Sequence, residues 1–385
     1  MSLTFSDINI CNNTTNDWTI FMYIMEEDKN LVSPFNYAVS NLSNYFKSAG
    51  IDSSASNINL CILKRANNHY GSYKMIINKG EIVSKFMTNI GYITPTTYGD
   101  VDMLDPFVLY NFIKEGMKTC PSKKTALFMQ CHSNAWYLKQ DMNESRIRAY
   151  AEIFHPLIVE NFKFNILCIT SCFVSTIELA YEVRNLANYL IAHEIGSPIL
   201  PMWSSTTMFA FSNSSYSDKD ICFQIVEDYM FHSNLSSIED KQDEMKVKTD
   251  IAVIDLANLD SFVNYLSSLN LQSISKKGLL ASRPDPDNYE KYPTIYMCHD
   301  IYTAVKEGLN LSQEDFEEFE TKFDQVVVKY IQNKKLKKEK WSNILNGLAY
   351  VPCPWKHEKN GYTYKSLEFY KFSDKFINCD LFLSS

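Results

Sequence analysis

The chain has 385 residues, of which 45% are hydrophobic and only 11 are glycine, a composition of folded globular proteins rather than of disordered or fibrous ones. Because single cores stop growing near about 250 to 300 residues, we expect a main domain and a smaller part. The net charge of −8 argues against a nucleic-acid-binding protein, which normally carries a basic excess on one face.

No apolar stretch reaches the roughly 20 residues of a membrane span, and residues 1–17 are polar, without the apolar core of a signal peptide. The ten cysteines lie mostly inside apolar runs and lack paired short spacings, as is typical of reduced thiols in intracellular proteins. We therefore expect a monomeric cytoplasmic protein with no membrane partner, preceded by a disordered polar tail over residues 1–17.

The first half of the chain alternates between strand-like and helix-like segments. Asp105 and Pro106 are suited to the cap and first turn of a helix. This alternation predicts an α/β fold with a mostly parallel central sheet that is flanked by helices. Strands are predicted at residues 18–25, 58–65 and 125–131, a hairpin at 71–82, and helices within 26–50 and at 104–119.

The segment "FNILCITSCFVSTIELAYEVRNLANYLIAHE", residues 164–194, is predicted to be a buried strand followed by one long helix. Apolar residues from Leu179 to Leu190 repeat at helical spacing. Cys172 lies at the junction, where the positive end of the helix would favour the thiolate, the reactive form of cysteine. Backbone N–H groups at this turn could also bind a developing oxyanion.

The second half of the chain is less regular. Its acidic helix is expected to be solvated and to end in the basic run at residues 333–340. We place a core domain at residues 18–215 and a smaller C-terminal α/β part at 216–385. Strands or helices are predicted within residues 251–269, 294–309, 312–324 and 346–355.

His132 and Cys172 each follow a predicted strand of the sheet. In parallel sheets the loops at the carboxyl ends of the strands form the ligand crevice. If the two strands are neighbours, their separation of about 4.8 Å brings both side chains to one substrate bond. A lone cysteine in such a turn is usually structural, but a histidine at a matching strand end makes a cysteine nucleophile an equally good interpretation.

Zinc binding by Cys131, His132, Cys168 and Cys172 is the alternative chemistry. Neighbouring residues of a strand point to opposite faces, so Cys131 and His132 do not suit one ion. No C-x-x-C pair supports such a site. We therefore predict no metal site and no cofactor.

Several blocks of the chain resemble the clostripain family of clan CD cysteine peptidases. "WTIFMYIMEEDKNL" is similar to the opening strand and acidic loop of that family, and "TALFMQCHSNAW" to its strand that ends in H-G-x-G-W. "TSCFVSTIELAYEVRNLANYLIAHE" is similar to its D-A-C-L-M-x-x-x-E-x-A-Y-E block, and "IAVIDLANL" and "GLAYVPCPW" to C-terminal blocks. The blocks follow the order of the family over residues 18–375.

The resemblance implies a caspase-hemoglobinase fold and an endopeptidase that cleaves protein or peptide substrates through a Cys/His dyad. It makes His132 the general base or acid and Cys172 the nucleophile. The backbone N–H groups of Ser133 and Cys172 would form the oxyanion hole. Glu178 matches a glutamate in the helix after the cysteine, to which we assign a structural role.

Two departures from the family pattern bear on function. "HSNAW" lacks both glycines of H-G-x-G-W, so a backbone angle φ above zero would cost more there. Thr170 stands in the predicted substrate pocket, with Ser171, where the family carries the aspartate that pairs with a P1 Arg or Lys. Without that carboxylate, a basic P1 residue loses a charge-assisted contact of about 1.5 to 3 kcal/mol.

These losses leave an alternative function open. A catalytically impaired pseudopeptidase would use the same scaffold as a peptide- or protein-binding module. A third hypothesis is a cytosolic structural protein without a peptide-binding cleft. The presence of both His132 and Cys172 favours the enzyme, because a scaffold that drifts without catalysis has no reason to keep both.

Overall fold

The computed structural model shows an α/β fold around one nine-stranded sheet. The predicted helix within residues 26–50 and residues 1–15 of the predicted tail lie outside the described residues. The described residues are 16–25, 58–65, 73–78, 81–87, 102–139, 147–197, 205–239, 248–284, 298–353 and 364–377. The strands, in their order across the sheet, are β13 (Val327–Gln332), β11 (Asp250–Asp255), β10 (Ala187–Ala192), β9 (Phe164–Thr170), β5 (Ser122–Gln130), β1 (Asn16–Met25), β2 (Ile58–Arg65), β3 (Tyr73–Asn78) and β4 (Glu81–Met87).

The middle of the sheet is parallel and its two edges are antiparallel. Strands β2, β1, β5, β9 and β10 run in one direction. Strands β3 and β4 at one edge, and β11 and β13 at the other, add antiparallel pairs. The predicted parallel centre of the sheet is therefore confirmed. The predicted tail is two residues too long, because β1 already begins at Asn16.

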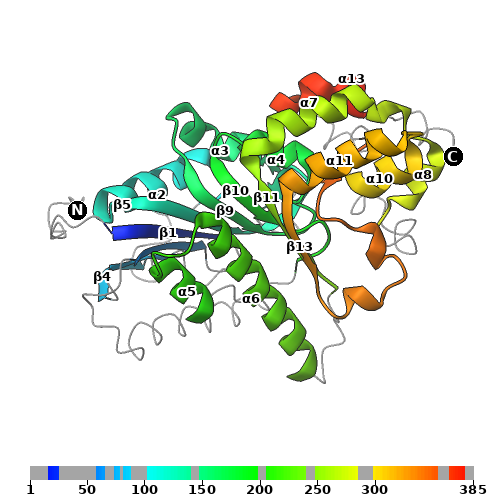
Figure 1. Cartoon of the computed structure of the whole chain (residues 1–385). Coiled ribbons are helices and arrows are strands. Elements are labelled where there is room, and N and C mark those ends of the chain that lie inside the picture. The colour runs from blue at the N-terminus through cyan, green and yellow to red at the C-terminus, as the bar shows by residue number, and fades with distance from the viewer. Residues whose placement is uncertain are drawn as a thin grey trace.

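Each face of the sheet has its own apolar core. Along β1, Phe21 and Tyr23 lie in one core, whereas Ile20 and Met22 lie in the other. Because both faces are buried, the strand has a continuous apolar sequence instead of an alternating one. In Figure 1, α2 (Pro106–Thr119), α3 (Tyr150–Val159) and α4 (Ile177–Val183) cover one face, and α5 (Ser205–Ser212) and α6 (Asp218–Glu239) cover the other.

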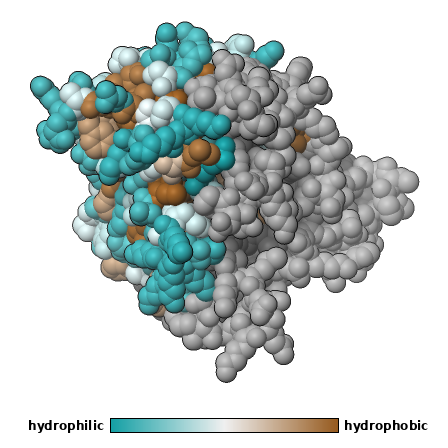
Figure 2. Space-filling model, turned by 90° about the vertical axis from the view of Figure 1, so that its right-hand side faces the viewer, coloured by the Kyte–Doolittle hydropathy of each residue, from teal (hydrophilic) through white to brown (hydrophobic). Residues whose placement is uncertain are grey.

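The C-terminal half adds β11 and β13 to this sheet and a group of helices beside it (Figure 1). On the face shown in Figure 2, the described residues are mostly hydrophilic, with small separate apolar patches. None of the helices in the described part of the chain combines the length and apolarity that a membrane crossing requires. The helices of this group are α7 (Leu259–Leu269), α8 (Lys276–Ala281), α10 (Ile301–Gly308), α11 (Gln313–Val326) and α13 (Ser373–Phe376).

The prediction of one long helix up to Glu194 is wrong for the second half of that segment. The helix α4 ends at Val183, and Ala187–Ala192 forms strand β10. This strand lies between β9 and β11 and pairs with both. A short apolar run fits a helical and an extended period equally well, and here the pairing with two neighbouring strands decided between them.

Two smaller predictions also need correction. The acidic helix is confirmed as α11, but the basic run does not form its end, because β13 lies between them. Cys353 is disulfide-bonded, so the prediction of reduced thiols fails at this position. The cysteines that are free in the described part of the chain are Cys61, Cys120, Cys131, Cys168, Cys172, Cys222 and Cys298.

Candidate active site

The two strands that precede His132 and Cys172 are parallel neighbours. β5 and β9 stay in register up to the pair Gln130 and Thr170. His132 and Cys172 each lie two residues after this last pair, so both are at the carboxyl ends of these parallel strands. The adjacency of the two strands, on which the predicted dyad depends, is therefore present in the fold.

Hydroxyl groups join the two strand-end loops, which we define as residues 131–135 and 171–173. The Ser133 hydroxyl lies within hydrogen-bond distance of two acceptors, the Cys172 carbonyl oxygen at 2.9 Å and the Ser171 hydroxyl, and its single proton can be donated to either. The Ser171 hydroxyl in turn donates to the Cys131 carbonyl oxygen. These bonds connect the two loops and hold the backbone at His132 and the backbone at Cys172 in a fixed relative position.

Each strand-end loop contains a residue in the left-handed backbone region. Ala135 has φ 53° and Phe173 has φ 57°. The Ala135 N–H donates to the Phe173 carbonyl oxygen over 2.8 Å, so the two left-handed residues are bonded to each other. The cost expected from the loss of glycine therefore applies at Ala135, whereas Ser133 lies in the short strand β6 (His132–Asn134) and has no positive φ.

The surroundings of the Cys172 thiol differ from the prediction. Helix α4 begins only at Ile177, with its N-cap at Thr176, so its positive end does not lie at Cys172. Burial raises the pKa of the Cys172 thiol, and a hydrogen bond from the Ser197 N–H, 3.4 Å from Sγ, opposes this rise. The direction of the pKa shift is therefore opposite to the expected lowering, because burial outweighs the hydrogen bond from Ser197.

The neighbouring cysteines do not form a metal site with Cys172. Cys168 lies in the core on one face of the sheet, whereas Cys131 and Cys172 pack against the core on the other face. The four residues of the zinc alternative therefore cannot surround one ion. Burial also raises the pKa of the Cys131 thiol to about 11, which makes it a poor nucleophile at neutral pH. Within the described ranges, no group of His, Cys, Asp and Glu side chains is arranged to hold a metal ion.

The two predicted pocket residues have different surroundings. Thr170 is half-buried, and its hydroxyl donates to the Met129 carbonyl oxygen over 3.2 Å. Ser171 is only 2% exposed, and its hydroxyl belongs to the bridge between the strand-end loops. Their role in substrate binding stays a prediction.

A group of buried carboxyl groups lies on α4 and on segments packed beside it, and the sequence had singled out only Glu178 among them. Glu178 is fully buried and accepts a hydrogen bond from the Val351 N–H over 2.9 Å, and burial raises its pKa to about 7. We call this group the acid junction. Its members each accept a backbone N–H from another segment, and they are Glu178, Glu182, Glu194, Asp250 and Asp300.

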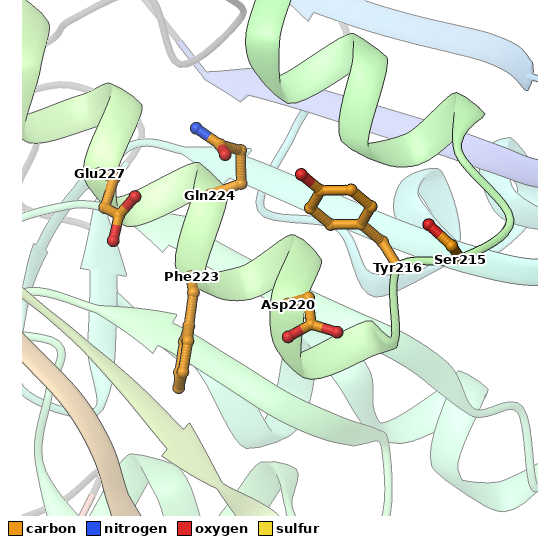
Figure 3. A pocket seen from close by; sticks show the side chains of 6 residues that line it. All are labelled: Ser215, Tyr216, Asp220, Phe223, Gln224 and Glu227. Carbon is orange, nitrogen blue, oxygen red and sulfur yellow. The ribbon is translucent and has the colours of Figure 1, made fainter.

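A surface pocket of about 340 Å³ lies away from the strand-end loops. Figure 3 shows that its side chains come from α6 and from the turn before it. Its Glu227 is paired with Lys329, and the Lys329 ammonium lies over the Phe223 ring, 4.6 Å from the ring centroid. The lining residues are Ser215, Tyr216, Asp220, Phe223, Gln224 and Glu227, and none of them is a predicted catalytic residue.

Comparison with known proteins agrees with the resemblance seen in the sequence. The sequence profile of the clostripain family matches residues 36–339, which is more than half of the chain. No curated protein matches the chain.

Similar folds occur among solved structures. A secreted C11 cysteine protease from Bacteroides thetaiotaomicron, "iotapain", has a TM-score of 0.68 at 15% identity over 94% of this chain and 99% of its own. A second structure of a secreted C11 protease from that organism, in complex with an irreversible peptide inhibitor, has a TM-score of 0.66 at 13% identity, over 93% and 99%. An inactive zymogen C11 protease from Parabacteroides distasonis has a TM-score of 0.64 at 15% identity, over 94% and 99%. The fold is therefore that of the C11 proteases.

Proposed function

Since the chain belongs to the clostripain family and is a cysteine-type endopeptidase, we propose that Cys172 is its nucleophile and His132 its general base. The observation that carries this proposal is the parallel pairing of β5 with β9, because it puts both residues at the carboxyl ends of neighbouring strands. Family membership also favours an active enzyme over the binding-module and structural alternatives. The substrate class is protein or peptide.

Burial raises the pKa of the Cys172 thiol, so a base has to remove the thiol proton before or during attack. His132 takes the thiol proton as the sulfur attacks the scissile carbonyl carbon, and the carbonyl oxygen becomes an oxyanion. Within the described residues the Cys172 N–H has no hydrogen-bond acceptor, so it is available to bind that oxyanion together with the Ser133 N–H.

The tetrahedral intermediate then collapses. The peptide C–N bond breaks, and His132 returns its proton to the leaving amine. A water molecule, from which His132 removes a proton, hydrolyses the remaining thioester and regenerates the thiol. The bridge from Ser133 to Cys172 supports this role because it holds the proposed base and nucleophile on loops of fixed relative position.

The test compares Cys172→Ala and His132→Ala with wild type in the hydrolysis of a fluorogenic peptide library. Both variants are expected to lose at least about a thousandfold in kcat/KM. Cys222→Ala is the matched control, because it removes a free, buried thiol of α6 outside the strand-end loops, and it should retain activity. Substantial hydrolysis by Cys172→Ala would contradict the proposal.

We also propose that the S1 pocket prefers an uncharged P1 residue. Thr170 offers a hydroxyl where the family carries a carboxylate, and this hydroxyl is bonded to the Met129 carbonyl oxygen. A peptide series that varies only at P1 should be cleaved poorly after Arg and Lys. Thr170→Asp is expected to raise cleavage after Arg, and strong Arg cleavage by wild type would contradict this preference.

A further inference from the structure

Ser197 contacts the sulfur of Cys172 from a third segment of the site, beyond the end of β10. Its backbone N–H donates to Sγ over 3.4 Å, and its carbonyl oxygen lies 4.0 Å from the same atom. The backbone of Ser197 can therefore bond both forms of the nucleophile. A thiolate accepts from the N–H, and a thiol donates to the carbonyl oxygen.

The side chain of Ser197 contacts α6, a helix on the other face of the sheet from α4. Its hydroxyl lies 3.2 Å from the hydroxyl of Tyr229, a residue of α6 that is fully buried. The Tyr229 ring packs against the His193 ring, with 4.9 Å between the centroids. His193 is itself fixed by a hydrogen bond between Nδ1 and the Asp250 carbonyl oxygen. Tyr229 is thus a rigid anchor for the segment that contacts the sulfur.

We propose that Tyr229 is a positioning residue, which holds Ser197 so that the Ser197 N–H points at the Cys172 sulfur and favours the thiolate. The inference deepens the proposed function and rests on Cys172 being the nucleophile. A thiolate that forms in a half-buried position needs hydrogen-bond donors in place of water. The Ser197 N–H is such a donor, and its direction depends on how firmly residue 197 is held.

The described titratable groups near the sulfur, apart from the proposed base, bring no positive charge to it. Cys131 at the end of β5 and Tyr229 on α6 interact electrostatically with Cys172, and Asp250 of β11 lies beyond Tyr229. All three are acids, which carry no positive charge in either protonation state. With His132 as the proposed base, the Ser197 N–H is the backbone donor that the described residues direct at the sulfur, and it favours the thiolate.

The experiment measures the rate at which iodoacetamide alkylates Cys172 between pH 5 and 10, with the modified peptide identified by mass. Tyr229→Phe removes only the anchoring hydroxyl, and Ser197→Ala removes only its partner. Each variant should lower the alkylation rate at pH 7 by about three- to tenfold and move the midpoint of the pH profile upward. Tyr229→Phe also removes the hydrogen bond of this hydroxyl with Thr249, so the double variant should react no more slowly than Tyr229→Phe alone.

Tyr265→Phe is the control, since it removes a tyrosine hydroxyl that donates to the Asp315 carbonyl oxygen on the far side of the fold. Circular dichroism establishes that each variant is folded, and Ser197→Ala carries the test if Tyr229→Phe does not fold. Unchanged alkylation profiles in folded variants would overturn the inference. Since alkylation requires no turnover, this failure is distinct from failure of the proposed function, which would appear as hydrolysis that survives Cys172→Ala.

Discussion

The strand-end loops and the acid junction satisfy their buried polar groups in different ways. In the loops, neutral hydroxyls such as those of Ser133 and Ser171 bond to one another and to carbonyl oxygens. In the acid junction, carboxyl groups such as those of Glu178 and Glu194 accept backbone N–H groups from the segment around residues 347–351. The first network joins two loops of one site, and the second joins the sheet layer to the C-terminal part.

Because of this difference, we expect the structure of the strand-end loops and that of the acid junction to depend differently on pH. The hydroxyl bridge of the loops carries no titratable group, so its geometry is expected to stay constant across neutral pH. In the acid junction, burial raises the pKa of Glu178 and Asp250 to about 7 and that of Asp300 to about 6. Substitutions in the acid junction should therefore act on stability and its pH dependence, and substitutions in the loops on activity.

The largest effect on stability is expected for Asp300→Ala. The Asp300 carboxylate caps α10 through the Thr303 N–H at 2.7 Å and accepts two more hydrogen bonds from Asn346. Its loss leaves buried donors unpaired and should lower the free energy of unfolding by about 3 to 5 kcal/mol. Urea denaturation at pH 7 measures this.

The matched control is Ser312→Ala, which removes the exposed N-cap of α11 and should cost about 1 kcal/mol. Equal losses in the two variants would show that Asp300 acts only as a helix cap and does not join segments.

Glu178→Gln should change how stability depends on pH. In the folded protein the pKa of Glu178 is raised to about 7, so the folded state binds the proton more tightly than the unfolded state does. Stability that this proton provides is fully present below the unfolded pKa, about 4.3, and is lost as pH rises through 7. Glutamine keeps the acceptor for Val351 without titrating, so relative to wild type it should gain about 1 to 3 kcal/mol between these pH values.

The measurement is urea denaturation of both proteins at several pH values. Glu318→Gln replaces a glutamate whose side chain is 56% exposed and should leave the pH dependence unchanged. If the free energy of unfolding changes with pH in the same way for Glu178→Gln and wild type, the role of the buried carboxyl group is refuted.

Ser171→Ala tests the bridge between the strand-end loops. Removal of the hydroxyl leaves the Cys131 carbonyl oxygen and the Ser133 hydroxyl each without one partner, which should cost about 1 to 2 kcal/mol of stability. Because the loops then lose part of their alignment, kcat should fall by about three- to tenfold at unchanged pH dependence. Peptide hydrolysis and urea denaturation measure the two effects.

Ser267→Ala is the control for that variant, because its hydroxyl bonds the Val263 carbonyl oxygen within α7 and lies outside both regions. It should lose stability only slightly and keep full activity. A Ser171→Ala enzyme with wild-type kcat would mean that the bridge does not place the catalytic groups.

Ala135→Gly should show the smallest change. Glycine relieves about 1 kcal/mol of left-handed strain at φ 53°, and it removes one buried methyl group, which costs about 0.8 kcal/mol. The two effects nearly cancel, so the thermal midpoint should stay close to that of wild type. Ala126→Gly, at a buried position of β5 without positive φ, should instead be clearly destabilising. Similar losses at both positions would show that Ala135 is not strained.

The sequence by itself determined the parts of this protein that depend on local pattern. Continuous apolar runs marked β1 and β5, because strands that are buried on both faces need apolar side chains at every position. Blocks around His132 and Cys172 were sufficient to identify the family, which the profile match confirmed. The family therefore followed from short stretches of chain whose chemistry is visible without the fold.

Only the tertiary structure decided what depends on neighbours distant in the sequence. Ala187–Ala192 became a strand because β9 and β11 flank it, although its apolar spacing also fits a helix. The contact of Ser197 with Cys172, and of Tyr229 with Ser197, joins segments 25 and 32 residues apart, and no local pattern marks them. Burial is likewise a property of the assembled layers, and this is why the pKa of Cys172 rises where the sequence alone predicted a fall.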